Sequence, residues 1–322
     1  MNQQSNIFVG IDVSKATLDI SMRGKHFQIK NSKKEISFFI KGKIAFKKIK
    51  PTLVCLESTG GYEIATIKCF QQAGIPIHRA HPNKVHAFAC ASNHFAKTDK
   101  LDAKLLEKYA NFISEKEKGD EPLSEASYEL QELRSVERNL QEDLHACQCS
   151  IKISYGKATK HLQAQIEFIQ IRLKKVRQDI DETIASDSQL EQTRDLLTSY
   201  KGVAKQTANV LVAELPELGK LSNKEVASLV GVAPKTYESG TKKLSGHIMG
   251  GRFYVRKALY MAALVASKHN KNMKAFYERL IAAGKEKKVA LVAVMRKIIV
   301  CLNAMVRDKE IYHEHSVEQI NG

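Results

Sequence analysis

Short apolar runs and amphipathic stretches alternate along the first third of the chain. The runs are rich in β-branched and aliphatic residues and are separated by turn residues, so they predict strands at 7–22, 26–30, 53–56 and 75–79. Helices are expected from Gly60 to Gln72, where Gly74 stops the pattern, and from Pro82 towards Phe95. This alternation predicts an α/β domain with a mixed sheet.

From about residue 127 the apolar positions recur every three or four residues, the spacing of one helix face. The clearest series is Leu162, Ile166, Ile169, Leu173, Val176, Ile180 and Ile184. It predicts a long antiparallel helical hairpin or an intermolecular coiled coil, acting as scaffold or dimerisation element. The last third also reads as helical. Its most apolar stretch, 289–306, is interrupted by Arg296 and Lys297 and is expected to be a buried helix and no membrane span.

Charge is distributed unevenly over the 322 residues, whose formal net charge is +16. Residues 1–110 carry 18 Lys and Arg against 8 Asp and Glu, and residues 200–322 carry 21 against 10. Residues 111–199 carry 12 against 17. Two basic blocks around an acidic spacer predict two contacts with a polyanion. Six cysteines without paired CxxC motifs, and no signal peptide, indicate a reducing cytoplasmic location.

Four acidic residues in the N-terminal third carry the candidate chemistry. Asp12 and Glu57 end strand-like runs, and Asp99 and Asp102 are spaced to share one helix face. Converging carboxylates repel each other unless cations neutralise them, and an all-oxygen site suits Mg²⁺, with Mn²⁺ as a substitute. Such a site activates and stabilises oxygens in phosphodiester chemistry, which indicates a nuclease or a DNA strand-transferase. Two nearby acids are not included. Asp19 is expected to point away from the buried side of its strand, and Glu63 is expected to lie on the surface of the helix that follows Gly61.

A glycine- and lysine-rich loop at 232–252 separates predicted helices in the last third. Loops of this length inside a compact domain are usually functional or disordered. It holds two Ser-Gly pairs, beginning at Ser239 and Ser245. Upstream, residues 200–208 resemble a helix-hairpin-helix turn, whose backbone N–H groups hold a DNA phosphate, although Ala204 replaces its second glycine.

Taken together in their order, these motifs resemble one transposase family. The matching segments are 10–15, 57–62, 97–103, 239–240, 250–252, 256–263 and 275–277. They are similar to the DEDD transposases of the insertion sequence one-ten group, which includes the Piv-type DNA invertases. The resemblance covers nearly the whole chain. It implies a RuvC-like (RNase H-like) α/β domain at 1–112, a helical coiled-coil spacer at 113–195, and a mainly α C-terminal transposase domain at 196–322.

The resemblance also implies roles for particular residues. Asp12, Glu57, Asp99 and Asp102 would be the catalytic metal ligands, and Ser239 the nucleophile, with Ser245 as its competitor. Six basic residues are candidate phosphate contacts: Lys97, Lys242, Lys243, Arg252, Arg256 and Lys257. The implied partners are donor and target DNA, a bridge-type guide RNA and further copies of the chain, as a dimer or tetramer in the nucleoid. The alternatives are a Piv-like invertase, a RuvC-like structure-specific nuclease that needs no serine, and a non-catalytic nucleic-acid-binding protein.

Overall fold

The computed structural model describes residues 6–45, 49–92, 98–235, 238–239, 242–243 and 247–313. The chain divides into two compact units, residues 1–123 and 124–322. The helical spacer therefore lies in the same unit as the C-terminal helices. The finer division of the chain into three domains stays a prediction.

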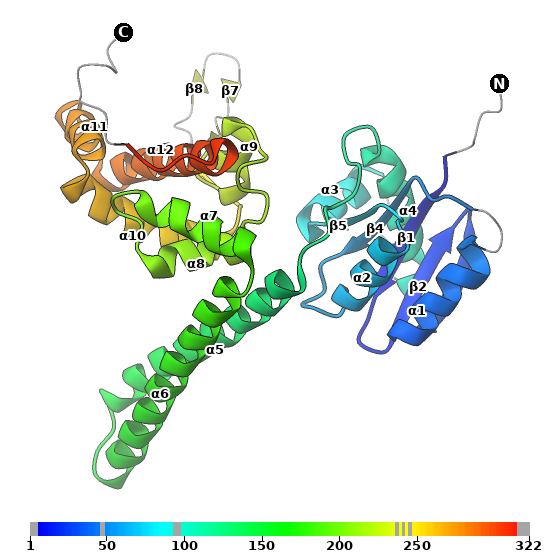
Figure 1. The fold of residues 1–322 in the computed structure, drawn as a ribbon, viewed down its shortest axis with the longest axis horizontal. Coiled ribbons are helices and arrows are strands. Elements are labelled where there is room, and N and C mark those ends of the chain that lie inside the picture. Colours follow the sequence, from blue (N-terminus) through cyan, green and yellow to red (C-terminus); the bar gives the residue numbers. More distant parts are fainter. Residues whose placement is uncertain are drawn as a thin grey trace. The chain divides into compact units, whose positions relative to one another are not determined.

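A five-stranded mixed sheet forms the centre of the first unit (Figure 1). Its strands are β1 (Phe8–Val13), β2 (Thr17–Met22), β3 (Lys25–Lys30), β4 (Leu53–Glu57) and β5 (Ile77–Ala80). They lie in the order β3-β2-β1-β4-β5, antiparallel from β1 through β3 and parallel from β1 through β5. The mixed α/β sheet predicted from the hydrophobic pattern is confirmed.

Helices cover both faces of this sheet. On one face, α1 (Lys33–Phe39), the π-helical turn η1 (Ile40–Ala45) and α2 (Ile64–Gln72) bury a core with Val9, Ile11 and Leu56. On the other face, α3 (Pro82–Ala91) and α4 (Asp99–Ile113) form a smaller core with Leu53 and Cys55. The sequence pattern did not predict α1 or η1.

At Gly10 in β1 the backbones of the sheet and of α4 are in direct contact. A Cβ atom there would overlap the backbone carbonyl oxygen of Ala103 and the backbone nitrogen of Glu107, and would lie 2.7 Å from the carbonyl carbon of Leu106. Because these are backbone atoms, no side-chain rotation relieves the overlap. The absence of a side chain at Gly10 is therefore what lets α4 lie directly on β1.

The second unit begins with a long helical hairpin formed by α5 (Glu125–Ile151) and α6 (Lys157–Ala185) (Figure 1). Ile166, Ile169 and Leu173 are buried with Cys147 of α5. Nearer the hairpin base, Ile180 and Ile184 join the main core of the unit. The near-heptad series thus packs within the chain, which confirms the hairpin and leaves little of that series exposed for a second copy.

Six further helices pack around the hairpin base. They are α7 (Ser188–Ser199), α8 (Lys205–Glu214), α9 (Asn223–Val230), α10 (Phe253–His269), α11 (Lys271–Ala282) and α12 (Lys287–Asp308). Helix α12 is long and apolar enough to cross a membrane. It nevertheless packs at the centre of this core, where Val294, Ile298 and Leu302 are fully buried. This confirms the expectation of a buried helix.

Substituting Gly10 tests the β1–α4 contact. Gly10→Ala should lower the free energy of unfolding of the first unit by about 3 kcal/mol or more, because backbone must move to admit the methyl group. Gly42→Ala is the matched control, since a Cβ there meets no atom within 4 Å and glycine is the weaker helix former. Hydrogen exchange of the β1 and α4 amides during urea unfolding localises the effect. Equal stability of the two variants would contradict the contact.

Candidate catalytic site

Asp12 and Glu57 lie on neighbouring parallel strands. In the β1–β4 register Ile11 pairs with Leu56, so Asp12 and Glu57 come next, side by side. Side chains alternate between the faces of a strand, and Leu53 and Cys55 belong to the core beneath α3 and α4. Glu57, two residues beyond Cys55, and Asp12, two residues beyond Gly10, therefore face the α4 side of the sheet.

The other two acids enter from the start of α4. Thr98 caps this helix by accepting a hydrogen bond from the backbone N–H of Leu101 at 3.3 Å, and Asp99 and Asp102 lie in the first turn. Carboxylates are favoured there because the helix dipole places partial positive charge at this end. The expected helical placement of this pair is confirmed.

Burial and three neighbouring acids determine the electrostatic environment of Asp12. Burial, followed by the negative charges of Asp102, Asp99 and Asp19, raises the pKa of the Asp12 carboxyl from 3.8 to about 6. The backbone N–H of Val13 opposes this effect only in part. Among the described residues, no cation offsets the repulsion at Asp12.

This donor set suits a hard divalent cation in its chemistry. The donors are carboxylate oxygens, and uncompensated repulsion at Asp12 is what a cation relieves. As the side chains stand, the described part of the chain holds no group of three His, Cys, Asp or Glu residues placed to bind a metal ion. Asp99, at the start of α4, is exposed. The donor atoms and the charge of these residues thus suit a divalent cation. Binding would require their side chains to move toward one another.

Asp19 belongs to the Asp12 face, contrary to expectation. It is the direct cross-strand partner of Asp12 in the β1–β2 register and is only 4% exposed. It accepts hydrogen bonds from Gln28 and lies 2.7 Å from the His26 ring nitrogen. The alternation of polar Thr17, Asp19 and Ser21 showed that they share one face of β2, but only the structure shows that α4 covers this face.

Glu63 is buried and not a surface residue of the following helix. Its carboxylate is 2% exposed and accepts hydrogen bonds from the backbone N–H groups of Thr59 and Gly61 and from the Thr59 hydroxyl. Burial alone would raise the pKa of Glu63, but these hydrogen bonds outweigh it and lower the pKa below its ordinary value. Glu63 therefore fixes the loop that directly follows Glu57.

The serine loop contains two short antiparallel pairs that the sequence did not predict. The outer pair is β6 (Pro234–Lys235) with β9 (His247–Ile248), and the inner pair is β7 (Glu238–Ser239) with β8 (Lys242–Lys243). The inner register places Ser239 opposite Lys242, as cross-strand neighbours. The structure describes only the backbone of Ser239, Lys242 and Lys243. Lys97 and Ser245 lie outside the described residues.

Two glycines and two arginines close the base of this loop. A Cβ atom on Gly251 would overlap the backbone of Gly231, so the loop ends touch directly. Arg252 donates to both carboxylate oxygens of Glu217, at 2.6 and 2.5 Å, and to the backbone carbonyl of Glu214 at 2.6 Å. Arg256 donates to the carbonyl oxygen of Gly250. Lys257 is exposed.

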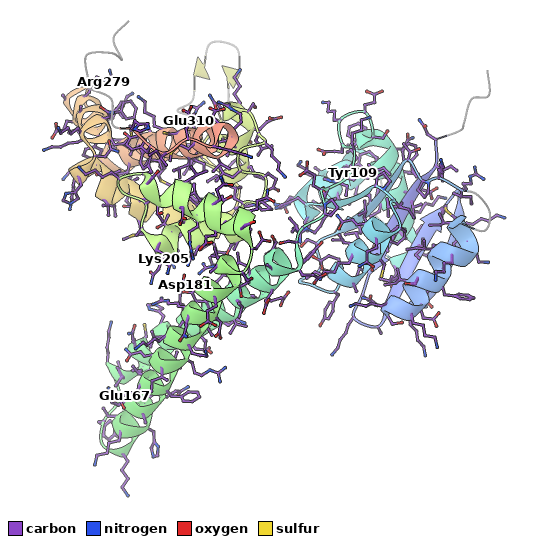
Figure 2. The ribbon with its side chains drawn as sticks, in the orientation of Figure 1. Tyr109, Glu167, Asp181, Lys205, Arg279 and Glu310 are labelled. Atoms are coloured by element: carbon purple, nitrogen blue, oxygen red, sulfur yellow. The ribbon has the colours of Figure 1, made fainter. Side chains whose placement is uncertain are left out.

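The turn between α7 and α8, which resembles a helix-hairpin-helix turn, is closely packed. Gly202 lies so near Ala266 of α10 that a Cβ would come within 2.9 Å of the alanine side chain. At the start of α8, Lys205 pairs with Asp181 of α6 at 2.8 Å (Figure 2). The lysine beside this turn thus has a protein partner in the hairpin.

Comparisons with known proteins agree with the order of the motifs. A model of the DEDD transposases of IS110 matches residues 9–152, and a model described as the transposase IS116/IS110/IS902 family matches residues 194–278. The chain belongs to the IS110 transposase family. The IS110-family chain is thus an enzyme of the transposase and site-specific recombinase class, which carries out DNA strand transfer.

Curated relatives of this IS110-family chain include two kinds of protein. The pilin gene-inverting protein of Moraxella lacunata is 25% identical over 96% of the chain and 99% of the relative. The insertion element IS110 43.6 kDa protein of Streptomyces coelicolor is 32% identical over 36% of the chain and 29% of the relative. The IS900 42 kDa protein of Mycobacterium paratuberculosis is 33% identical over 27% and 22%, respectively.

The raised pKa of Asp12 gives a pH prediction. Because the folded pKa lies above that of the unfolded chain, the stability contributed by Asp12 is full below about pH 4 and is lost as pH rises through about 6. Asp12→Asn should therefore raise the melting temperature at about pH 8 by about 2–4 °C and change it little near pH 4. Asp143→Asn, at an exposed carboxylate of α5, is the control. An Asp12→Asn effect independent of pH would contradict the repulsion.

The contact between Arg252 and Glu217 gives a second prediction. If Arg252 closes the loop base through Glu217, Glu217→Gln should speed amide exchange of residues 231–251 about tenfold. Glu278→Gln, at an exposed carboxylate 4.0 Å from Lys274, should leave exchange there unchanged. If Arg252 instead serves only as a phosphate ligand, Glu217→Gln would strengthen DNA binding without loosening the loop.

Proposed function

We propose that this DNA recombinase cuts and rejoins strands with a divalent-cation site and a serine nucleophile. Asp12, Glu57, Asp99 and Asp102 would hold the cation on the α4 face of a RuvC-like domain. The observation that supports this most is the raised pKa of Asp12, caused by burial and by the neighbouring acids. A structural carboxylate would have hydrogen bonds that outweigh its burial, as Glu63 has, whereas the backbone N–H of Val13 does not outweigh these effects at Asp12.

The chain's own residues would prepare this site before substrate arrives. Gly10 sets the distance between α4 and β1, and Glu63 orders the loop after Glu57. Asp19 adds negative potential at Asp12, which raises the pKa of Asp12 and would also attract a divalent cation. Mg²⁺, or Mn²⁺ in its place, would stabilise charge on the reacting phosphate and on the leaving oxygen.

Ser239 would attack the phosphorus of a DNA phosphodiester. An Oγ–P bond forms, the P–O bond to one DNA strand breaks, and the hydroxyl proton ends on the released DNA oxygen. A second DNA hydroxyl then attacks the phosphoserine, restores the serine and joins the strands. The family motif supports this role, and Lys242, the cross-strand neighbour of Ser239, together with Lys243, Arg256 and Lys257, would bind phosphates.

The proposed partners are donor and target DNA, a bridge-type RNA and further copies of the chain. The basic blocks at 1–110 and 200–322 support polyanion binding. Strand exchange between two duplexes requires at least two active sites, which favours a homo-oligomer. RNA guidance rests on the family resemblance alone, and the test is whether RNA-free protein still recombines its own sites.

Site-specific inversion is the second candidate function. It is favoured by the match to the pilin gene-inverting protein of Moraxella lacunata, which spans almost the whole of both chains. Both candidates share the carboxylate and serine chemistry. A substrate with inverted recombination sites, assayed beside one with element ends, separates them by product.

Removing Ser239 tests the nucleophile. Ser239→Ala should abolish both recombination and the covalent protein–DNA adduct that survives denaturation, while melting temperature and its increase with Mg²⁺ stay unchanged. Ser245→Ala is the matched control, one loop position with the same side chain, and should keep the adduct. If Ser245→Ala alone loses the adduct, the wrong serine has been assigned. An adduct in both single variants and in the double variant overturns the serine mechanism.

The cation site has its own test. Alanine at Asp12, Glu57, Asp99 or Asp102 should abolish cleavage, remove the Mg²⁺-dependent rise in melting temperature and leave nucleic-acid binding in place. Full cleavage by Asp99→Ala/Asp102→Ala protein in EDTA would contradict the site. Mixing Ser239→Ala with Asp102→Ala protein then asks whether different protomers supply the two groups, since recovered activity requires it.

A further inference from the structure

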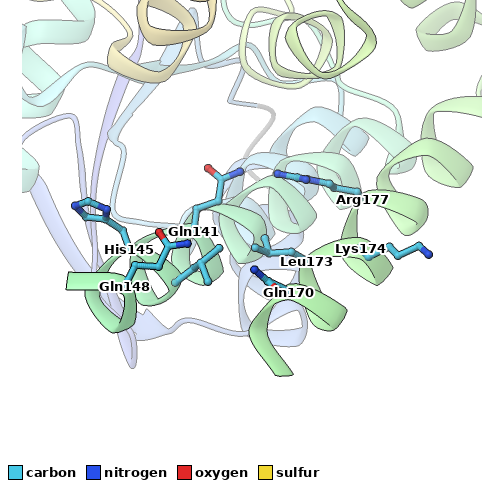
Figure 3. Close-up of a pocket in the computed structure, with 8 residues that line it drawn as sticks. Gln141, His145, Gln148, Gln170, Leu173, Lys174 and Arg177 are labelled. Atoms are coloured by element: carbon cyan, nitrogen blue, oxygen red, sulfur yellow. The ribbon is translucent and has the colours of Figure 1, made fainter. Parts of the chain in front are cut away.

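A groove with six polar lining residues runs along the helical hairpin of the second unit. It has a volume of about 390 Å³ and lies between α5 and α6 (Figure 3). Its polar lining is Gln141, His145, Gln148, Gln170, Lys174 and Arg177. Within each helix these residues follow the spacing i, i+4, i+7, so two matched rows of side chains face one groove.

The polar side chains that line this groove are all hydrogen-bond donors. Each of the six polar residues can donate an N–H hydrogen bond, and no carboxylate lines the groove. Leu144 and Leu173 supply its apolar part. A row of N–H donors without acceptor carboxylates suits a ligand rich in anionic oxygen, such as a chain of phosphodiesters.

Two residues of this lining are positioned by a buried carboxylate. Glu137, 3% exposed, accepts hydrogen bonds from Arg177 Nε at 2.9 Å and from Gln141 Nε2 at 3.1 Å, and it also pairs with Arg134. Figure 3 shows Gln141 and Arg177 turned toward each other from the two helices. Arg134 also lies 3.9 Å from Glu214, so a network of paired charges fixes this end of the groove.

Charge along the hairpin points to the same ligand. Residues 144–175, the outer half, carry six Lys and Arg against Glu167 alone. The base, residues 124–143 and 176–185, carries three Lys and Arg against nine Asp and Glu. The spacer is acidic overall, yet its outer half is basic. Tyr155, 89% exposed at the tip between Lys152 and Lys157, offers a ring on which an unpaired base can stack.

We propose that the outer half of the α5–α6 hairpin is a nucleic-acid-binding surface, with this groove seating the phosphate backbone. The proposal is independent of the carboxylate site and of the serine. It gives the hairpin a binding role in addition to its role as a scaffold. Because backbone contacts carry no sequence information, the groove would position nucleic acid without selecting its sequence.

Charge reversal in the groove of the full-length protein tests this. Gln148→Glu/Lys174→Glu should weaken binding of an RNA or a duplex DNA of equal length about tenfold and reduce the salt dependence of the affinity by about one phosphate contact. Gln192→Glu/Lys116→Glu is the matched control. It makes the same charge change at exposed positions outside the hairpin and outside both basic blocks. Gln148→Ala/Lys174→Ala removes the same two side chains without adding negative charge. It should weaken binding in the same direction but less, and it tests the groove if the charge-reversal variant fails to fold.

The two probes identify the source of the phosphates. Loss for RNA alone assigns the groove to RNA, loss for DNA alone assigns it to duplex DNA, and loss for both assigns it to backbone of either kind. Affinities within about twofold of the control for both probes overturn the proposal. A change in oligomeric state with unchanged affinities also overturns it, because the groove would then contact another copy of the chain.

Discussion

The contact of α4 with β1 at Gly10 is the constraint on which the candidate site depends. The helix begins at Asp99, so any displacement of α4 from the sheet also carries Asp99 and Asp102 away from Asp12. Only a residue without a side chain allows backbone-to-backbone contact here. Gly10 and Asp12 lie two residues apart on the same strand face, so one short segment supplies both the helix contact and an acid.

A second direct backbone contact determines the geometry of the serine loop. Gly231 and Gly251 touch where the loop leaves and re-enters the helical core, and Arg252 joins that point to Glu217 and to the end of α8. The β6–β9 pair extends this closure outward. The backbone of Ser239 is paired with Lys242 beyond this closed stem, which would lower the entropy lost in the proposed attack on DNA.

The sequence predicted the strands, most helices and the hairpin because each has a strong hydrophobic period. It missed the placement of Asp19 and Glu63 for different reasons. Asp19 required the β1–β2 register, which pairs it with Asp12, and a polar residue alone does not reveal its face. Glu63 required three-dimensional closure of the 58–61 loop onto its carboxylate. Helix α1 is too short for its period to stand out.

A basic residue can be interpreted as a phosphate contact only after its partners within the protein are known. Of the basic residues that the sequence nominates for phosphate binding, Arg252 is engaged by Glu217 and Arg256 by a backbone carbonyl, whereas Lys257 is exposed. The helical spacer, in contrast, is acidic overall. Its net negative charge arises at the base, where residues 124–143 and 176–185 carry nine Asp and Glu against three arginines. Those arginines, Arg134, Arg138 and Arg177, pair with Glu137 and with Glu214 of α8. The outer hairpin is left with exposed cations such as Lys174, so the net charge of a segment does not locate the surface that meets nucleic acid.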